Sequence, residues 1–391
     1  MKLRELIFND FRCFRGERVI SFVDPLTDEP RPMTVIVGTN GTGKTTVLEA
    51  IEGLLRYLAY GDRQVPPSIS ILQELAVSGN RQALPGILQE FAVSGRCRCG
   101  LWLDEGDLRG RIPPHLAREL RLTADAEHLK WQLDSQPGPD EARLLSASSG
   151  EEECQRQLSG LVVLVGEVAR MWLRQRELHG GLLVFTHDRR LGVSQGGPLQ
   201  PPEQQPQWVV RVSAPPEWSG SLEQHWVWQN YLDLEQGKSR DDGNGEHLSK
   251  FVAEVQALLG EQRKIRIREG RVYVTAGWAT EDPGNPDHMV RLDQLPSGEQ
   301  QVLLLFGELA RHLRPGCIIA IDEPEISLHP TLQRTVVHHL RRLARERDLQ
   351  VILCTHSLEI MRAASESEII NLDDPPERFT GESRDGECRL P

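Results

Sequence analysis

Apolar residues along the chain fall into short unbroken runs and into helical repeats, which predict different elements. Three runs have the length of buried strands: Thr34–Val37, Cys317–Ile321 and Val351–Thr355. Two further stretches place apolar residues at helical spacing: Val47, Leu48, Ile51, Leu54 and Leu55 in the first, and Val302, Leu305, Phe306, Leu309 and Leu313 in the second. Buried strands beside such helices predict an α/β fold.

The middle of the chain has a more mixed pattern. Alternating residues over Lys264–Thr275 predict a hairpin that turns at Glu269 and Gly270. The other elements expected there are one strand and three helices: Arg96–Leu103, Leu116–Leu133, Glu151–Leu178 and Val252–Leu259. Stretches rich in Pro, Gln, Gly or charge are expected to be loops or disordered: Leu191–Pro216, Lys238–Glu246 and the tail from Asp374.

Composition excludes several classes of protein. The chain has 391 residues, 39% hydrophobic and 26% charged, which leaves room for two domains or for one domain with a large insertion. No apolar run approaches the roughly 20 residues that span a bilayer, and the N-terminus lacks an apolar signal segment, so we expect a cytoplasmic protein without a membrane partner. The seven cysteines are scattered, which favours free thiols. A net charge of −12 argues against an indiscriminate nucleic-acid coat.

A glycine-rich turn joins the first predicted strand to the first predicted helix. It reads GTNGTGKT over Gly38–Thr45, the spacing of a phosphate-binding P-loop. Its backbone N–H groups would face phosphate oxygens, Lys44 would reach the β- and γ-phosphates, and the Thr45 hydroxyl would ligate Mg²⁺. A turn that only caps a helix is the alternative, but the spacing and both flanks agree with a P-loop. We therefore expect ATP and Mg²⁺ as cofactors and the following nucleotide-binding residues: Gly38, Asn40, Gly41, Gly43, Lys44, Thr45 and Thr46.

Polar residues also follow the other two predicted strands. Asp322 and Glu323 come directly after the second strand, as in a Walker B element. Asp322 would hold Mg²⁺ through water and Glu323 would polarise the attacking water, whereas a solvated acidic turn is the alternative. His356 follows the third strand. We expect it to sense the γ-phosphate, because it comes one helix-plus-strand unit after Walker B; a packing or capping histidine is the alternative.

The stretch LPSGEQQ, residues 295–301, stands directly before the second predicted helix. Ser297 is a good N-cap, so a plain capped helix would explain the stretch by itself. Yet Ser-Gly-Glu-Gln, then a helix, then Walker B and then His356 is the order of motifs in ABC-type ATPases. This resemblance implies that Ser297, Gly298 and Glu299 meet the γ-phosphate of ATP held by a second subunit. We therefore expect the chain to dimerise around ATP.

Further segments resemble the RecF-like and OLD-like branch of soluble ABC-type ATPases, which includes SMC, RecF and ATPase subunits of bacterial defence systems. They are the turn at Asn9, Phe11 and Arg12, the D-loop at Ser327, Leu328 and His329, the switch segment VILCTHSLEIM, and two weaker matches, Leu182–Arg190 and Trp226–Gly237. The resemblance implies an α/β P-loop NTPase with an ABC-type ATPase head. Two features depart from the wider pattern: only Gln89 is a candidate for the Q-loop glutamine, and Ser-Gly-Glu replaces the transporter Ser-Gly-Gly, as is usual in this branch.

The motifs lie at the two ends of the chain, which predicts a split core. The expected divisions are an ATPase core in 1–61 and 291–373, a mixed α+β insertion or lobe II that faces a partner in 62–290, and an acidic tail in 374–391. Within the insertion, ILQELAVSGNR at 71–81 recurs as ILQEFAVSGR at 87–96. Two copies are too few for a solenoid and indicate a local duplication.

Three functions remain open. The first is an ATPase subunit that gates a partner effector, such as a nuclease or toxin, in antiphage or toxin-type defence. The second is a RecF-like DNA-repair ATPase that acts on DNA directly, and the third is an ATP-dependent scaffold with negligible turnover, against which Glu323 counts. Thr331–Arg347 holds five arginines and one acid, either a phosphate-facing stripe or a solvated helix face. Only 35 residues follow His356, too few for the nuclease domain that OLD proteins carry there, so we expect no nuclease activity in this chain.

Overall fold

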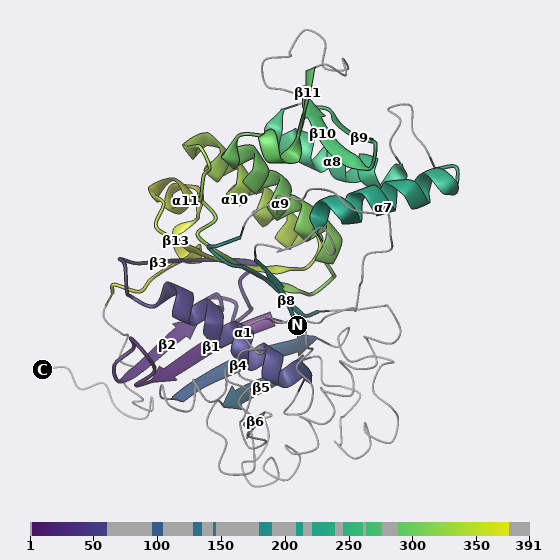
Figure 1. Cartoon of the computed structure of the whole chain (residues 1–391). Helices are drawn as coiled ribbons and strands as arrows, with labels where there is room; N and C mark the ends of the chain where they lie inside the picture. Colours follow the sequence, from purple (N-terminus) through teal and green to yellow (C-terminus); the bar gives the residue numbers. More distant parts are fainter. Residues whose placement is uncertain are drawn as a thin grey trace, which may run out of the picture.

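The computed structural model describes residues 2–60, 96–104, 128–134, 144–145, 180–189, 209–213, 221–238, 245–260, 263–275 and 288–374, and the fold is given for these. Figure 1 shows an antiparallel sheet at the bottom, a central parallel sheet with helices on its two faces, and a lobe of helices and a small sheet at the top. None of the described helices is long and apolar enough to cross a membrane.

The central sheet has six strands, each parallel to its neighbours. In order across the sheet they are β14 (Ile369–Asn371), β3 (Met33–Val37), β13 (Gln350–Thr355), β12 (Ile318–Asp322), β7 (Leu182–Phe185) and β8 (Val209–Val212). Every residue of β3, β12 and β13 is buried, which is why these strands read as continuous apolar runs. The carboxyl ends of all six strands meet at one edge, so the residues that follow β3, β7, β12 and β13 are brought together there.

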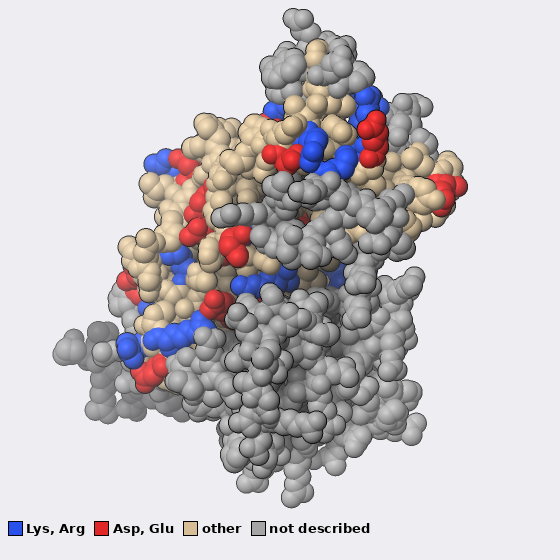
Figure 2. All heavy atoms as spheres, viewed as in Figure 1, with Lys and Arg blue, Asp and Glu red and all other residues tan. Residues whose placement is uncertain are grey.

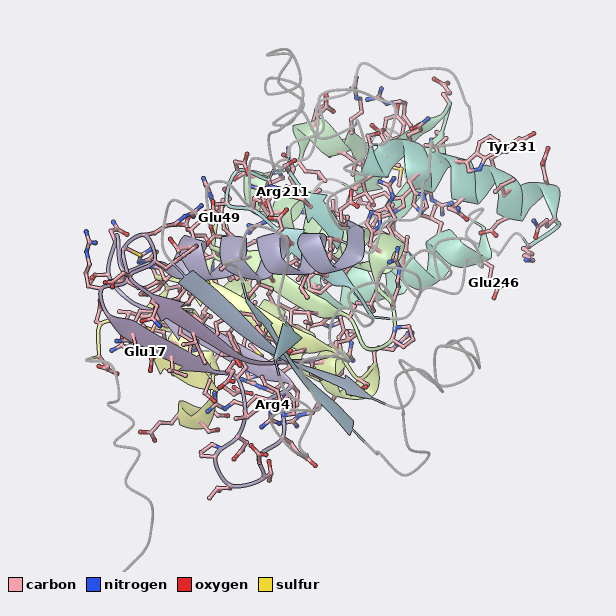
Figure 3. The ribbon with its side chains drawn as sticks, turned by 90° about the horizontal axis from the view of Figure 1, so that it is seen from below. Arg4, Glu17, Glu49, Arg211, Tyr231 and Glu246 are labelled. Atoms are coloured by element: carbon pink, nitrogen blue, oxygen red, sulfur yellow. The ribbon has the colours of Figure 1, made fainter. Side chains whose placement is uncertain are left out.

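Helices cover both faces of this sheet. They are α1 (Lys44–Tyr60), α9 (Ser297–His312), α10 (Pro330–Glu346) and α11 (Leu358–Ala363), with 3₁₀ turns at Leu292–Gln294 and Glu366–Glu368. Helix α1 packs on one face, and α9 and α10 lie on the other (Figure 1). Arg211 of β8 pairs with Glu52 of α1 at 2.8 Å, which fixes the helix on the outer strands. Figure 3 shows Arg211 close to this helix.

A second, antiparallel sheet lies below α1 (Figure 1). Its order is β2 (Glu17–Ser21), β1 (Lys2–Asn9), β4 (Arg96–Asp104), β5 (His128–Asp134) and β6 (Leu144–Leu145). The buried Gln350 side chain joins the two sheets, because its amide accepts from the backbone N–H of Leu3 at 2.6 Å and donates to the Leu3 carbonyl at 2.8 Å. One side chain thus satisfies two backbone groups of β1 that would otherwise be buried without partners.

The upper lobe packs on α9 and shares its hydrophobic core with the central sheet. It consists of α7 (Leu222–Glu235), α8 (Glu246–Leu259) and a three-stranded sheet of β9 (Ile265–Arg268), β10 (Arg271–Thr275) and β11 (Met289–Arg291). Gly307 of α9 allows α7 to approach closely: a Cβ atom there would lie 2.5 Å from Leu222 Cδ2 and 2.5 Å from Trp226 Cζ2.

Most expected elements are confirmed, including the parallel α/β sheet and the hairpin turning at Glu269 and Gly270. Two expectations are wrong. The end of the expected helix Leu116–Leu133 is strand β5, whose sequence HLKWQLD alternates with period two. The expected loop Leu191–Pro216 contains strand β8, hidden between Pro- and Gln-rich neighbours.

The central sheet also differs from the expected split core. Strands β7 and β8, from within 62–290, pair beside β12, so the core is not confined to 1–61 and 291–373. The expected helix Glu151–Leu178, the duplication at 71–96, the candidate Gln89 and the tail beyond Asp374 lie outside the described residues.

Candidate nucleotide-binding site

The P-loop connects β3 to α1 at the carboxyl edge of the central sheet. Gly41 and Gly43 have φ values of +84° and +104°, a region that favours glycine. A Cβ atom at residue 43 would also lie 2.5 Å from Phe14 Cζ and 2.7 Å from Cys13 Sγ, so only glycine fits there. The turn after β1 therefore presses directly on the loop and fixes its shape.

The lysine of the loop is folded over the loop itself. Lys44 is 6% exposed, and its Nζ donates to the carbonyl oxygens of Gly38 at 2.8 Å and Thr39 at 2.9 Å. On the outer side, the Asp373 carboxylate accepts from the backbone N–H and the hydroxyl of Thr39, each at 2.9 Å. The ammonium group is thereby held at the N-terminus of α1, where a helix already favours anions. This arrangement fits a phosphate ligand.

The acid of the neighbouring strand meets the P-loop. The Thr45 hydroxyl donates to Asp322 Oδ2 at 3.1 Å, and Asp322 is 4% exposed. Burial raises the pKa of Asp322 above its ordinary value, while the hydrogen bond from Thr45 acts in the opposite direction. The two residues supply the hydroxyl and carboxylate oxygens that Mg²⁺ takes beside a nucleotide.

A histidine without an assigned role stands beside this pair. His187, which follows β7, places Nδ1 3.5 Å from Asp322 Oδ2, with 61% of its side chain exposed. Among the described residues, no group of three or more His, Cys, Asp or Glu side chains could hold a metal by themselves. A Mg²⁺ ion here would therefore need phosphate oxygens and water to complete its coordination, as is usual for this ion.

Glu323 and His356 are tied to the same edge through their backbones. Glu323 has a left-handed φ of 48°, and its N–H donates to the Cys354 carbonyl at 2.8 Å. The N–H of His356 donates to Glu325 Oε1 at 2.7 Å, while the His356 side chain is exposed. Hydrogen bonds thus join the turn after β12 to the end of β13 and the segment that follows it. Both candidate catalytic side chains lie at the sheet edge that carries the P-loop.

The Ser-Gly-Glu turn at residues 297–299, here called the signature turn, is built differently from a helix capped by Ser297. Helix α9 begins at Ser297 itself, Pro296 occupies the N-cap position, and no side-chain capping bond forms. Ser297 is exposed. Gly298 allows the D-loop to approach, because a Cβ atom there would lie 2.7 Å from the Ser327 carbonyl oxygen. The expected N-cap role of Ser297 is therefore wrong, and its hydroxyl is left for another partner.

Glu299 differs from the other two signature residues because it is held inside its own chain. Its carboxylate pairs with Arg263, and the side chains are 17% and 13% exposed. In the described part of the chain, no hydrogen bond or ion pair joins residues 297–299 to the P-loop. The structure thus brings together the candidates of the P-loop and Walker B, but not those of the signature turn.

Sequence reasoning missed two residues that lie beside the candidate site, His187 and Arg189. Both lie in the segment Leu182–Arg190, which was matched to the family without a role. Arg189 is 2% exposed and donates to the carbonyl oxygens of Asp322 at 2.6 Å and Glu323 at 2.9 Å. The available signal was a short apolar strand followed at once by polar residues, the same signal that marked Walker B.

The arginines of α10 are largely engaged with acids. Arg334 pairs with Glu359, and Arg341 pairs with Glu368 at 2.7 Å with 15% of its side chain exposed. Figure 2 shows basic and acidic residues side by side over the described surface of the face in view. The solvated helix face is therefore a better interpretation of Thr331–Arg347 than a phosphate-facing stripe.

Comparisons with known proteins agree with these motifs. A family model described as an AAA domain, putative AbiEii toxin, type IV TA system, matches residues 279–362, and another described as an AAA domain matches residues 5–67. The chain is 25% identical over 377 residues to the OLD nuclease of Thermus scotoductus, covering 91% of this chain and 59% of that protein. It is 28% identical over 120 residues to the methionine import ATP-binding protein MetN of Corynebacterium jeikeium, covering 31% of this chain and 30% of that protein.

Solved structures give a fainter likeness. The SMC head domain from Thermotoga maritima aligns with a TM-score of 0.42 at 15% identity, covering 93% of each chain. The SmcHead bound to the C-winged helix domain of ScpA aligns with a TM-score of 0.45 at 15% identity, covering 95% of this chain and 94% of that one. The assignment rests instead on the family models and on the contact of the P-loop with Walker B. On that basis the chain is an α/β P-loop NTPase with an ABC-type head, and it is similar to AAA-domain proteins in two segments and to the OLD nuclease over most of its length.

Proposed function

We propose that the chain binds Mg·ATP at the P-loop edge and hydrolyses it. The observation that carries this proposal is the 3.1 Å contact of the Thr45 hydroxyl with Asp322, beside the buried ammonium of Lys44. A hydroxyl, a carboxylate and a cation at one helix N-terminus match the parts that phosphoryl transfer requires. Mg²⁺, when bound, would neutralise charge that develops on the transferred phosphoryl group.

Each residue of the proposed site has a separate role in ATP hydrolysis. Lys44 neutralises the β- and γ-phosphates, and Thr45 and Asp322 would hold the ion, with His187 placed beside Asp322 where it could bind a water of the ion. Glu323 accepts the proton of the attacking water, so that the water oxygen forms a bond to the γ-phosphorus while the bridging bond to ADP breaks. His356 contacts the γ-phosphate, and this contact is lost with the phosphate after hydrolysis.

The site is completed by a second copy of the chain. Support comes from the exposed Ser297 at the N-terminus of α9 and from the close contact of Gly298 with the D-loop. Helix N-termini bind phosphate oxygens, so this turn suits the γ-phosphate held by a partner's P-loop. Glu299 has a supporting role, because its pairing with Arg263 ties the turn to the upper lobe.

The direct test is ATP hydrolysis by the purified chain and by Lys44→Ala. Loss of the ammonium should lower turnover by at least about 100-fold, because it removes the cation proposed to neutralise the β- and γ-phosphates. Lys264→Ala, which removes an exposed lysine of the upper lobe, is the matched control and should retain wild-type turnover. Wild-type turnover by Lys44→Ala would show that the nucleotide site is assigned wrongly.

A finer proposal concerns the biological output: the ATP state gates a partner effector, such as a nuclease or toxin, in antiphage or toxin-type defence. The description of the model matched at 279–362 and the OLD nuclease relative favour this class. The chain spans 59% of that nuclease, and we propose that it cuts neither DNA nor RNA itself. Nuclease assays on the pure chain, and pull-downs of co-expressed neighbouring gene products with ATP and with ADP, test this.

The same experiments distinguish the effector-gating proposal from the RecF-like alternative. ATP-dependent retention of DNA by the pure chain, without any protein partner, would favour direct action on DNA. Metal-dependent cleavage by the wild type that persists in Glu323→Gln would place a nuclease in this chain. Nucleotide-dependent capture of a partner protein, with no cleavage by the pure chain, is the result we expect.

A further inference from the structure

A buried arginine holds the backbone on both sides of the Asp322–Glu323 bond. The guanidinium of Arg189 donates through Nη1 to the carbonyl oxygens of Asp322 at 2.6 Å and Thr186 at 2.9 Å, and through Nη2 to Glu323 at 2.9 Å. Among the described residues, no carboxylate lies within 4.0 Å of it to form an ion pair. Burial lowers the pKa of Arg189 to about 10, and the nearby acids Asp322, Glu325 and Glu323 oppose that shift, so it stays charged at neutral pH.

The held segment is conformationally unusual. Glu323 has a φ of 48°, which costs a non-glycine residue roughly 1–3 kcal/mol unless its surroundings impose it. Its N–H is fixed by the Cys354 carbonyl at 2.8 Å and its own carbonyl by Arg189. With both backbone polar groups fixed, the direction in which the Glu323 side chain leaves the sheet edge is fixed as well.

The same arginine is linked to α9, the helix that begins at the signature turn. Gln301 Nε2 donates to the backbone carbonyl of Arg189 at 3.3 Å. Gln301 lies four residues after Ser297 in α9, one helical turn along and on the same face. An unbroken series of contacts therefore runs from the turn proposed to meet a partner's nucleotide, through Gln301 and Arg189, to Glu323.

We propose that Arg189 is a positioning residue that couples α9 to Glu323 within one chain. Docking of Ser297 on the partner's γ-phosphate would set α9, and through Gln301 and Arg189 would set the acid for hydrolysis at the chain's own site. This inference rests on the proposed ATPase function and adds a route by which the two sites of a dimer act together. A buried arginine that only stabilises the fold is the competing explanation.

The test uses turnover, nucleotide affinity and thermal stability of the full chain. Lysine cannot span two carbonyl oxygens as the arginine fork does, so Arg189→Lys should lower kcat at least about 10-fold and leave the affinity for a fluorescent ATP analogue within about threefold. Arg211→Lys is the control: its partner is the Glu52 carboxylate, which lysine can still meet, and kcat should be unchanged. Gln301→Leu breaks only the link to α9 and should lower kcat about 2- to 10-fold.

A double-variant cycle separates positioning from folding. If Arg189 acts through Glu323, Arg189→Lys should cost little further turnover in a Glu323→Gln background. If Arg189→Lys lowers turnover in the Glu323→Gln background as much as it does alone, the proposal is overturned. Equal losses of nucleotide affinity and kcat in Arg189→Lys would also overturn it. Should Arg189→Lys not fold, Gln301→Leu decides by the same cycle. An inactive wild type would overturn both this inference and the ATPase proposal, whereas an active wild type with unaffected Arg189→Lys and Gln301→Leu would overturn this inference alone.

Discussion

The Thr45 hydroxyl donates a hydrogen bond to Asp322 Oδ2 at 3.1 Å, although 277 residues separate the two in sequence. The contact joins the first turn of α1 to the end of β12, and thereby joins the two segments matched by separate AAA models. Local structure does not bring these two residues together. The pairing of β3 with β13 and of β13 with β12 places them together, so integrity of the central sheet is a condition for the site.

Glu323→Gln should trap ATP between two copies of the chain. The amide keeps the shape and hydrogen bonding of the side chain but cannot accept the proton of water, so turnover should fall by roughly 10²- to 10⁴-fold. ATP would then persist and hold the dimer. Light scattering with and without Mg·ATP measures this, with Glu346→Gln on the exposed face of α10 as the control. A monomeric mass with ATP bound would contradict the sandwich.

His356→Ala should separate turnover from binding. The side chain is exposed at the end of β13 and its proposed contact forms only with the γ-phosphate. Loss of one hydrogen bond to a charged group corresponds to roughly a 10- to 100-fold lower kcat, with ADP affinity nearly intact. Nucleotide titration and steady-state kinetics provide both values. Equal losses of ATP and ADP affinity would identify His356 as a structural residue.

The sequence predicted those parts of the site that are local in the chain. The P-loop and the Walker B acids each combine a buried strand with the polar residues that follow it, so spacing alone predicts them as candidates. The roles of His187 and Arg189 depend on β7 lying beside β12, a pairing between segments more than 130 residues apart that periodicity does not encode.

Two local features were also beyond sequence reasoning, for different physical reasons. Ser297 has a favoured N-cap residue type, but Pro296 takes the cap because its extended backbone precedes the helix directly. Glu299 suits a helix N-terminus, but a tertiary partner, Arg263, binds it instead. For Glu299 a contact with a neighbouring element outweighed the local preference, whereas for Ser297 the backbone of the residue directly before it did.

His187 is expected to affect Mg²⁺ more than nucleotide. Nδ1 lies 3.5 Å from Asp322 Oδ2, close enough to share a water of the ion, and loss of such an outer contact weakens metal affinity by roughly 10- to 100-fold. His187→Ala should therefore need more Mg²⁺ for half-maximal nucleotide binding, and His187→Gln should need less than His187→Ala. Mg²⁺ titration of a fluorescent ATP analogue measures this, with His338→Ala as the control. An unchanged titration in His187→Ala would remove the residue from the metal site.

Gly307 should be required for docking of the upper lobe. Alanine is favoured over glycine by about 1 kcal/mol within a helix, yet its Cβ would lie 2.5 Å from Leu222 and Trp226 side-chain atoms. Overpacking of this kind costs about 1–3 kcal/mol, so Gly307→Ala should lower the free energy of unfolding despite its better propensity. Urea denaturation gives the value. The same change in a Leu222→Ala background should cost less, because only the contact with Trp226 remains; an equal loss there would rule out the clash with Leu222.

His225 should make the stability of the α7–α9 junction depend on pH. Burial, followed by the nearby Arg311 and His312, lowers the pKa of His225 from 6.5 to about 3. Below about pH 6.5 the unfolded chain therefore binds a proton at this residue that the folded chain does not, and the free energy of unfolding falls as pH drops toward 3. Between pH 7 and pH 5 the wild type should lose about 1–2 kcal/mol more than His225→Gln.

Urea denaturation at the two pH values measures this difference. His338→Gln, which changes an exposed histidine of α10, serves as the control and should keep the wild-type loss. Because the charged residues facing His225 carry positive charge, Arg311→Gln should reduce the pH dependence without abolishing it, since burial remains the larger cause. Equal pH dependence in the wild type and His225→Gln would mean that residue 225 gains its proton in the folded chain as readily as in the unfolded one.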